Sequence, residues 1–158
     1  MSLIKQTKKV RAVMIIEVIG KPKEHLTETL EGMIKQISDE KGVKINEKKI
    51  NEPTLLKPKT DEQKIPEGFY TTFAEIEVEI EEILYLAMLM FKYMPAHIEI
   101  LDPETITLTN NGLNDILNEL TRRLHGYDEV ARIIQMEKNI LEKKLRELMP
   151  EKEADEKK

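Results

Sequence analysis

Apolar residues follow two different periods in the first fifty residues of the chain. Residues 10–19 are rich in β-branched side chains and are followed by Gly20, which predicts a central, buried strand. From Pro22 to near Gly42 the apolar residues recur every three or four positions, which predicts an amphipathic helix. Residues 43–50 alternate between apolar and polar side chains, as in a strand with one solvated face.

The next segment, residues 53–68, contains three prolines and few apolar side chains. We expect it to be a long exposed connection that proteases cut first. Residues 69–80 alternate again, but the apolar positions change parity near Ala74. A β-bulge at that residue would explain the change.

An almost continuously apolar helix is predicted over residues 83–94, ended by Pro95. Residues 97–101 predict a further strand, and residues 105–108 a short fifth one. The element order over residues 10–101 is therefore βαββαβ, which predicts a ferredoxin-like α+β fold with an antiparallel sheet.

The C-terminal third of the chain has a heptad repeat that predicts a coiled-coil helix over residues 112–149. The a positions are Leu117, Leu124, Ala131, Lys138 and Leu145, and the d positions are Leu113, Leu120, Tyr127, Ile134, Leu141 and Leu148. Lys138 is the one charged residue among them. A helical hairpin broken at Gly126 is the alternative, because basic residues precede this glycine and Asp128 follows it. The heptad register crosses Gly126 without a skip, which favours one continuous helix.

We accordingly divide the chain into an α+β domain over residues 1–109, a helical extension over residues 110–149 and a disordered charged tail over residues 150–158. The helix at 83–94 is apolar almost all round, which fits either a helix buried in an ordinary core or an outer surface that is covered. We favour the covered surface, with the C-terminal helix or a second subunit packed over it. We expect the oligomer interface to comprise the nine large apolar heptad residues together with Met88 and Met90 from that helix. The nine are Leu113, Leu117, Leu120, Leu124, Tyr127, Ile134, Leu141, Leu145 and Leu148.

The composition argues against several kinds of chemistry but identifies no particular activity. The 158 residues include no cysteine, three histidines and a net charge of −5, which argues against thiolate chemistry, histidine-rich metal sites and nucleic-acid binding. No apolar run approaches the ~20 residues that span a bilayer, so we expect a cytoplasmic protein without membrane contact. The surplus of Lys and Glu, without Cys or Trp, is similar to thermophile usage.

Candidate chemical groups are sparse and separated. His25, His97 and His125 form no two-histidine metal motif, and each is expected to be an ordinary surface residue. Residues 75–82 carry five glutamates, which could attract a cation or a basic partner but suit the solvated face of a sheet better. We therefore predict no catalytic residue, no metal and no cofactor, with cofactor-binding residues unknown.

Three segments carry a resemblance: residues 15–22, residues 70–75 and residues 93–101. With the element order, they make the chain similar to ACT-like and ferredoxin-like regulatory modules and to an uncharacterised archaeal family. The resemblance implies a module that assembles or binds a small ligand at a dimer interface, and it implies no catalytic residue. We expect a non-catalytic homo-oligomer, a homodimer or larger, with an assembly or regulatory role. The alternative is a sensor that binds a small-molecule effector between subunits.

Overall fold

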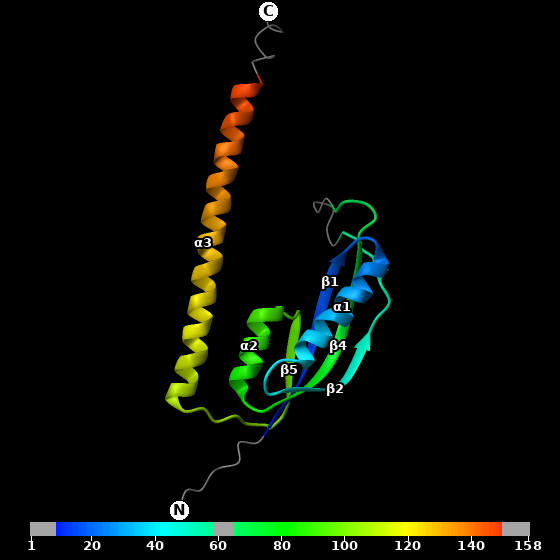
Figure 1. Cartoon of the computed structure of the whole chain (residues 1–158), viewed down its shortest axis with the longest axis vertical. Helices are drawn as coiled ribbons and strands as arrows, with labels where there is room; N and C mark the ends of the chain where they lie inside the picture. Colours follow the sequence, from blue (N-terminus) through cyan, green and yellow to red (C-terminus); the bar gives the residue numbers. More distant parts are fainter. Residues whose placement is uncertain (1–8, 59–64, 150–158) are drawn as a thin grey trace, which may run out of the picture. The chain divides into compact units, whose positions relative to one another are not determined.

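A computed structural model of the chain describes residues 9–58 and 65–149 (Figure 1). The chain divides into two compact units between Ile116 and Leu117, so that the boundary falls inside the last helix. The predicted tail at 150–158 lies outside the described residues, as does the middle of the connection at 53–68.

The first unit is built on an antiparallel sheet with the order β2-β4-β1-β5. Its central strands are β1 (Val10–Gly20) and β4 (Tyr70–Ile80), which pair along their whole length. The edges are β2 (Val43–Ile50) and β5 (His97–Asp102), and the two-residue strand β3 (Thr54–Leu55) also pairs with β4. The β-rich runs of the sequence thus form one sheet.

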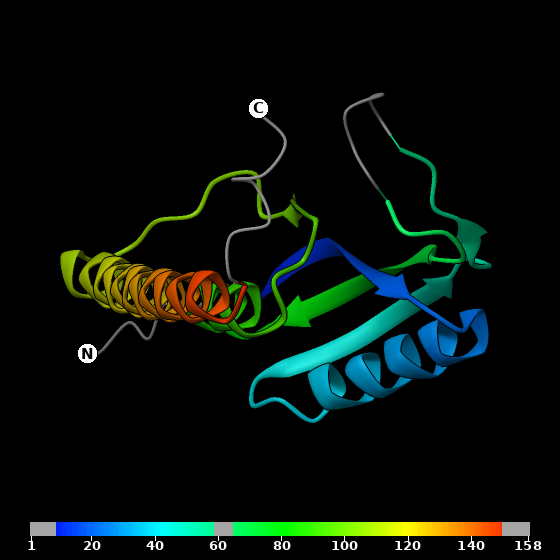
Figure 2. The same ribbon diagram turned by 90° about the horizontal axis from the view of Figure 1, so that it is seen from above.

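Helices α1 (Lys23–Ser38) and α2 (Ile83–Tyr93) contribute to the same apolar cluster as the sheet. Figure 2 shows α1 lying along one face of the sheet. Side chains alternate across a strand, so every second residue of β1 and β4 points into this cluster. Its fully buried members include Met14, Ile16, Leu30, Ile37, Ile76, Val78 and Ile80.

The predicted bulge near Ala74 is wrong. The pairing of β4 with β1 is continuous from Ile80 to Tyr70, with Ala74 opposite Ile16. Ala74 and Thr72 occupy core positions, and Thr72 is buried while its hydroxyl donates to the Asn51 carbonyl. The parity changes because two small residues fill the core side, which leaves Phe73 exposed on the other face.

Two further details differ from the sequence prediction. Residues 54–55 form β3 inside the segment expected to be a connection, because they pair with Thr71 and Tyr70. Residues 105–108 form no strand and belong to an irregular connection between β5 and the last helix. The sheet does contain register shifts, but not at Ala74. One lies in β2, between Ile45 and Glu47, and the other in the pairing of β1 with β5.

Two local contacts close the side of the core where α1, α2 and β2 meet. Gly42 has a φ of +71°, and a Cβ there would lie 2.6 Å from the Tyr85 ring. The Tyr93 hydroxyl donates to Glu40 at 2.7 Å, and the Lys92 ammonium donates to the same carboxylate. The end of α1 is thereby joined to the end of α2.

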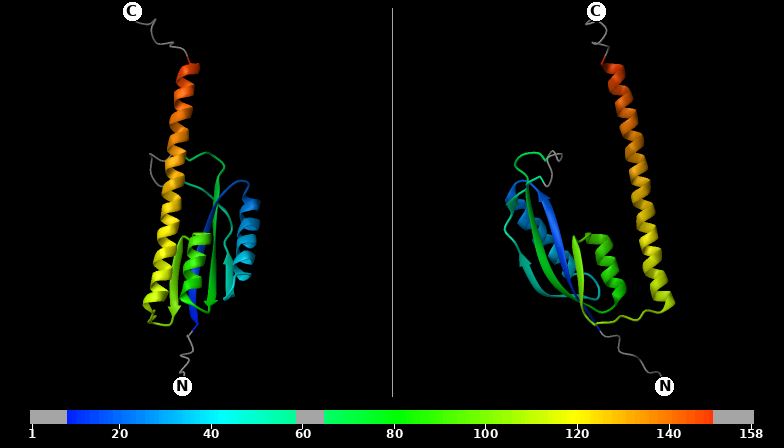
Figure 3. Two further views of the ribbon diagram at one scale, coloured as in Figure 1. Left: turned by 60° about the vertical axis from the view of Figure 1, so that its left-hand side comes forward. Right: turned by 180° about the vertical axis from the view of Figure 1, so that it is seen from behind.

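The last helix, α3 (Asn110–Leu148), is 39 residues long and passes through Gly126 without a break, as both views in Figure 3 show. Thr109 caps it, since its hydroxyl accepts from the Gly112 amide at 3.1 Å. The hairpin alternative is wrong, and the continuous helix is confirmed. The fold is mixed α+β, with an antiparallel sheet followed by a long C-terminal helix.

Candidate subunit interface

The predicted interface residues of α3 form a line that we call the α3 seam, comprising the heptad a and d positions from Leu113 to Leu148. No side chain of this helix is buried. Leu124 is 57% exposed, Leu141 66% and Leu148 79%, whereas Leu120 is half-buried. Leucines usually lie inside folded proteins, and a contiguous exposed line of them indicates a surface for association.

Ion pairs along α3 stabilise the helix but leave the large apolar seam residues exposed. Arg123 Nε lies 3.0 Å from Glu119 Oε1, and Arg132 Nη2 lies 2.7 Å from Asp128 Oδ2. Hydrogen bonds from Arg122 and then Arg123 lower the pKa of Glu119. Exposed pairs at this spacing favour a helix only weakly. The ion pairs help to explain why α3 is long. They do not explain why its apolar seam residues are exposed.

A second apolar line lies beside the α3 seam, and heptad reasoning on a and d positions missed it. Its members are Val130, Ile133, Met136 and Ile140, all at least 48% exposed. They fall on the heptad positions g, c and f, next to the d side of the seam. Their three- and four-residue spacing was present in the sequence and could have been found by testing a wider stripe.

The methionine side of α2 is the other predicted contact surface. Leu86, Leu89 and Tyr93 of this helix belong to the core cluster, whereas Met88 is 40% exposed and Met90 36% exposed. The helix is therefore amphipathic in place, with its methionines toward solvent. The pairing of this surface with the α3 seam of a second subunit stays a prediction.

The histidines lie in three different elements and are not brought together. His25, in α1, lies 3.3 Å from Glu28, in an exposed pair three residues apart. His97 begins β5, and His125 lies on the exposed surface of α3. Across residues 9–58 and 65–149, no group of three or more acidic or histidine side chains is placed to hold a metal ion.

The glutamates of β4 share the open face of the sheet and face basic residues there. Lys9 Nζ lies 2.9 Å from Glu79 Oε1, and Arg11 Nε lies 3.4 Å from Glu77 Oε1. The hydrogen bond from Lys9 lowers the pKa of Glu79. Glu75 lies opposite Lys49 in the register of β2. The solvated-face interpretation accounts for this acidic row through charges that the chain itself supplies.

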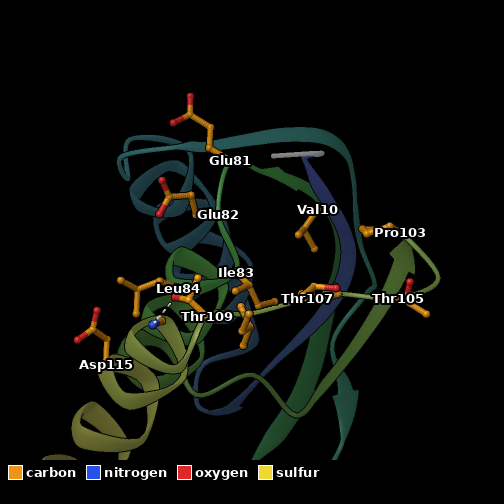
Figure 4. Close-up of a pocket in the computed structure, with 13 residues that line it drawn as sticks. Val10, Glu81, Glu82, Ile83, Leu84, Pro103, Thr105, Thr107, Thr109 and Asp115 are labelled. Atoms are coloured by element: carbon orange, nitrogen blue, oxygen red, sulfur yellow. Dashed lines mark hydrogen bonds between the residues drawn. The ribbon is translucent and has the colours of Figure 1, made fainter. Parts of the chain in front are cut away.

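A cavity of about 540 Å³ opens in the first unit between the start of β1, the start of α2 and the connection after β5 (Figure 4). Val10 and Ile83 provide apolar surface, and Thr105, Thr107 and Thr109 supply hydroxyls. Glu81, Glu82 and Asp115 supply carboxylates, which are spread along one side of the view in Figure 4. No lysine, arginine or histidine lines this cavity among the described residues. Its chemistry suits a neutral or cationic molecule better than an anion.

No helix in the described part of the chain is long and apolar enough to cross a membrane. A sequence model of the MJ0538 family, an uncharacterised family named for an archaeal protein, matches residues 11–152. The match includes the sheet, both short helices and the whole of α3, so the long helix belongs to the shared pattern. Comparisons with curated proteins and with solved structures gave no match.

Proposed function

The chain belongs to the MJ0538 family, and we propose that it is a non-catalytic homodimeric module with an assembly or regulatory role. In this proposal α3 joins the subunits, and the α+β unit is the platform that the dimer carries. The observation that carries it is the α3 seam, whose apolar residues are sustained over five heptads and whose leucines, apart from the half-buried Leu120, are exposed in a single chain.

The energetics favour a second helix on the α3 seam. Full burial of one leucine side chain contributes roughly 1.5–3 kcal/mol, and a coiled coil buries several from each subunit. A single solvated helix would forgo all of that stabilisation and leave a long apolar line that promotes aggregation. A second copy of the chain is always available and presents the same line.

We further propose that the first unit is a ferredoxin-like module. The order β2-β4-β1-β5 and the placement of α1 and α2 in one core cluster support this. In that arrangement the two crossover helices cover one face of the sheet, and the opposite face remains available for contacts. The charged open face and the exposed Phe73 lie on that free side.

Adjacent isoleucines on α3 give a matched test. Ile134 is a d residue and Ile133 a c residue, and both are about half exposed in a single chain. We expect Ile134→Glu to halve the mass measured by light scattering, from twice 18.4 kDa to 18.4 kDa, because it would bury a charge in the interface. Ile133→Glu should leave the dimer intact. Equal dissociation by both variants would contradict the assigned seam, and a wild-type monomer would contradict the proposal.

The second candidate function is a small-molecule sensor, and the cavity beside Val10 and Ile83 is the observation that favours it. A ligand that binds the folded state must raise the melting temperature by mass action. We expect a thermal-shift screen of amino acids, nucleosides and amines to separate the two functions. A saturable shift that Thr107→Leu abolishes would favour the sensor, whereas no shift for any compound would favour the assembly role alone.

The absence of a catalytic role in this proposal rests on where the reactive side chains lie. His25, His97 and His125 occupy separate elements, and the strongest carboxylate contacts are ion pairs on solvated surfaces. A general acid–base pair requires two groups within reach of one substrate. No described histidine or lysine joins the carboxylates beside the cavity. Glu40, Lys92 and Tyr93 do contact one another, and in this proposal they join α1 to α2.

A further inference from the structure

We propose that the two α3 helices pair antiparallel, with the twofold axis beside Glu129. This inference rests on the proposed dimer and adds the orientation and register of its helices. The evidence is the order of residue sizes and charges along the continuous helix. That order fits an antiparallel pair better than a parallel, in-register pair.

In antiparallel coiled coils an a residue of one helix packs opposite a d residue of the other. An axis at Glu129 brings the α3 seam from Leu113 to Leu145 into such layers without a gap, and Leu148 lies beyond the last layer. The layers are Leu113 with the partner's Leu145, Leu117 with the partner's Leu141, Leu120 with the partner's Lys138, Leu124 with the partner's Ile134, and Tyr127 with the partner's Ala131. Each layer occurs twice by symmetry, so the contact uses almost the full length of the helix.

The layers nearest the axis match in size. Tyr127, the largest seam residue, packs against the partner's Ala131, the smallest. In a parallel, in-register pair Ala131 would face the partner's Ala131, and Tyr127 the partner's Tyr127. That alignment would leave a gap in one layer and crowd the next, and both defects cost stability in a packed core.

The charged seam residue favours the same orientation. A parallel pair would place Lys138 in one layer with the partner's Lys138. The antiparallel pair places it against the partner's Leu120, along which its methylene stem can lie while its ammonium group points toward Glu142, 3.8 Å away. The two ammonium groups are then separated by about 27 Å along the axis, at 1.5 Å per residue. This exceeds the screening length of about 8 Å at physiological salt.

The residues that flank the seam add charge complementarity. The antiparallel register places Arg123 beside the partner's Glu137 on both sides of the axis, whereas a parallel pair would oppose Glu137 and the partner's Glu142. The parallel pair would gain only a contact of Arg123 with the partner's Asp128. Asp128 lies near its own copy in the antiparallel pair, but each is already bound to Arg132 at 2.7 Å.

The antiparallel orientation also accounts for the position of the second apolar line, because it places this line on one side of the dimer. Position g meets g of the partner on one side of an antiparallel pair, so Val130 contacts the partner's Val130 at the axis. Ile133, at position c, lies beside Val130 on that side in both subunits but outside the packed a and d layers. A parallel pair would divide these residues between two opposite sides of the dimer.

Distances between spin labels on cysteine variants test the orientation in the full-length chain. The natural sequence contains no cysteine, so one substitution introduces one label in each subunit. Lys143 and Glu129 are both exposed f residues, away from the seam. In the antiparallel dimer labels at Glu129→Cys should lie about 20 Å apart, and labels at Lys143→Cys about 45 Å apart, because residue 143 is 28 positions from its opposite, residue 115.

The outcomes are distinct. A distance of about 20 Å at both sites would overturn the antiparallel orientation while leaving the dimer in place. Long distances at both sites would overturn the axis at Glu129. Absence of dipolar coupling at both sites would reject the dimer itself, and with it the proposed function. A short distance at Glu129→Cys together with a long one at Lys143→Cys is the result that we expect.

Discussion

Helix α1 buries Leu26, Leu30, Ile34 and Ile37 within 16 residues, whereas α3 runs for 39 residues without burying one side chain. Both helices have an apolar stripe at helical spacing. The stripe of α1 packs against β1, β2 and β4 of its own chain. The stripe of α3 continues far beyond the length of any strand in the sheet, since a 39-residue helix is about 58 Å long.

The comparison shows that a stripe identifies the face of a helix that needs covering but not the chain that covers it. Length and period separate the two cases. The stripe of α1 is broad and short, as in a helix that lies on a sheet. The α3 seam keeps a seven-residue repeat over five heptads, as in helices that pair with helices. Burial of the α1 stripe therefore stabilises the folded chain, and in the proposed dimer burial of the α3 seam would stabilise association.

The largest effect should come from Leu141→Ala, because each dimer loses two buried leucines. We expect a cost of about 2–5 kcal/mol per subunit, seen as a large increase of the dimer dissociation constant in sedimentation equilibrium. Ile140→Ala is the matched control, since Ile140 is also exposed in one chain, 52% against 66% for Leu141, but lies outside the seam. A neutral Leu141→Ala would mean that residues 112–149 form a solvated helix.

Leu30→Ala tests the other half of the comparison. Leu30 is fully buried in the core cluster, so the truncation should lower the free energy of unfolding of the first unit by about 2–5 kcal/mol. Urea unfolding followed by circular dichroism measures this loss, and Glu31→Ala is the exposed control. The dissociation constant of the dimer should change little. Strong dissociation caused by Leu30→Ala would show that the two regions are not energetically separate.

Two glycines distinguish the regions through backbone geometry. Gly42→Ala should destabilise the first unit by more than about 1 kcal/mol, because alanine is strained at a φ of +71° and its Cβ would meet Tyr85. Gly126→Ala should stabilise α3 by about 0.5–1 kcal/mol, because no atom lies near and the site is mid-helix. Thermal unfolding measures both. Destabilisation by Gly126→Ala would revive a helix break at that residue.

The smallest expected effect is a change in how the stability of the first unit depends on pH. Hydrogen bonds from Lys92 and then from Tyr93 lower the pKa of Glu40 below its ordinary value of 4.5. The resulting stabilisation of the first unit is present above the unfolded-state pKa and is lost as the pH falls through the lowered folded-state pKa. Glu40→Gln should therefore be less stable than the natural protein near pH 7, and the difference in stability should narrow as the pH falls below 4.5 and through the lowered folded-state pKa. A difference independent of pH would contradict this role, and self-association should be unaffected by the substitution.

Periodicity was sufficient to predict the principal elements, because strands and helices impose different spacings on apolar residues. It predicted the face of α1 and the continuity of the heptad through Gly126. It did not predict the side on which Phe73 lies, since Thr72 and Ala74 are small enough to fill the core side of β4. It also missed β3, whose two residues are too few to show a period.

The sequence identified many residues of the candidate interface, but it did not show how far the apolar surface of α3 extends. The heptad repeat selected the exposed leucines of α3, whereas Val130, Ile133 and Ile140 were missed because an a/d stripe is narrower than the apolar surface of this helix. The cavity beside Val10 was not predictable, since its lining residues come from three separate segments that only the fold brings together.

Sedimentation equilibrium of the unmodified full-length chain at tens of micromolar tests the central claim most directly. The account predicts a single species of twice 18.4 kDa that persists on dilution to low micromolar concentration, because the α3 seam is buried between two copies. A species of 18.4 kDa throughout that range would contradict it, and would mean that α3 stands exposed in solution as an isolated helix.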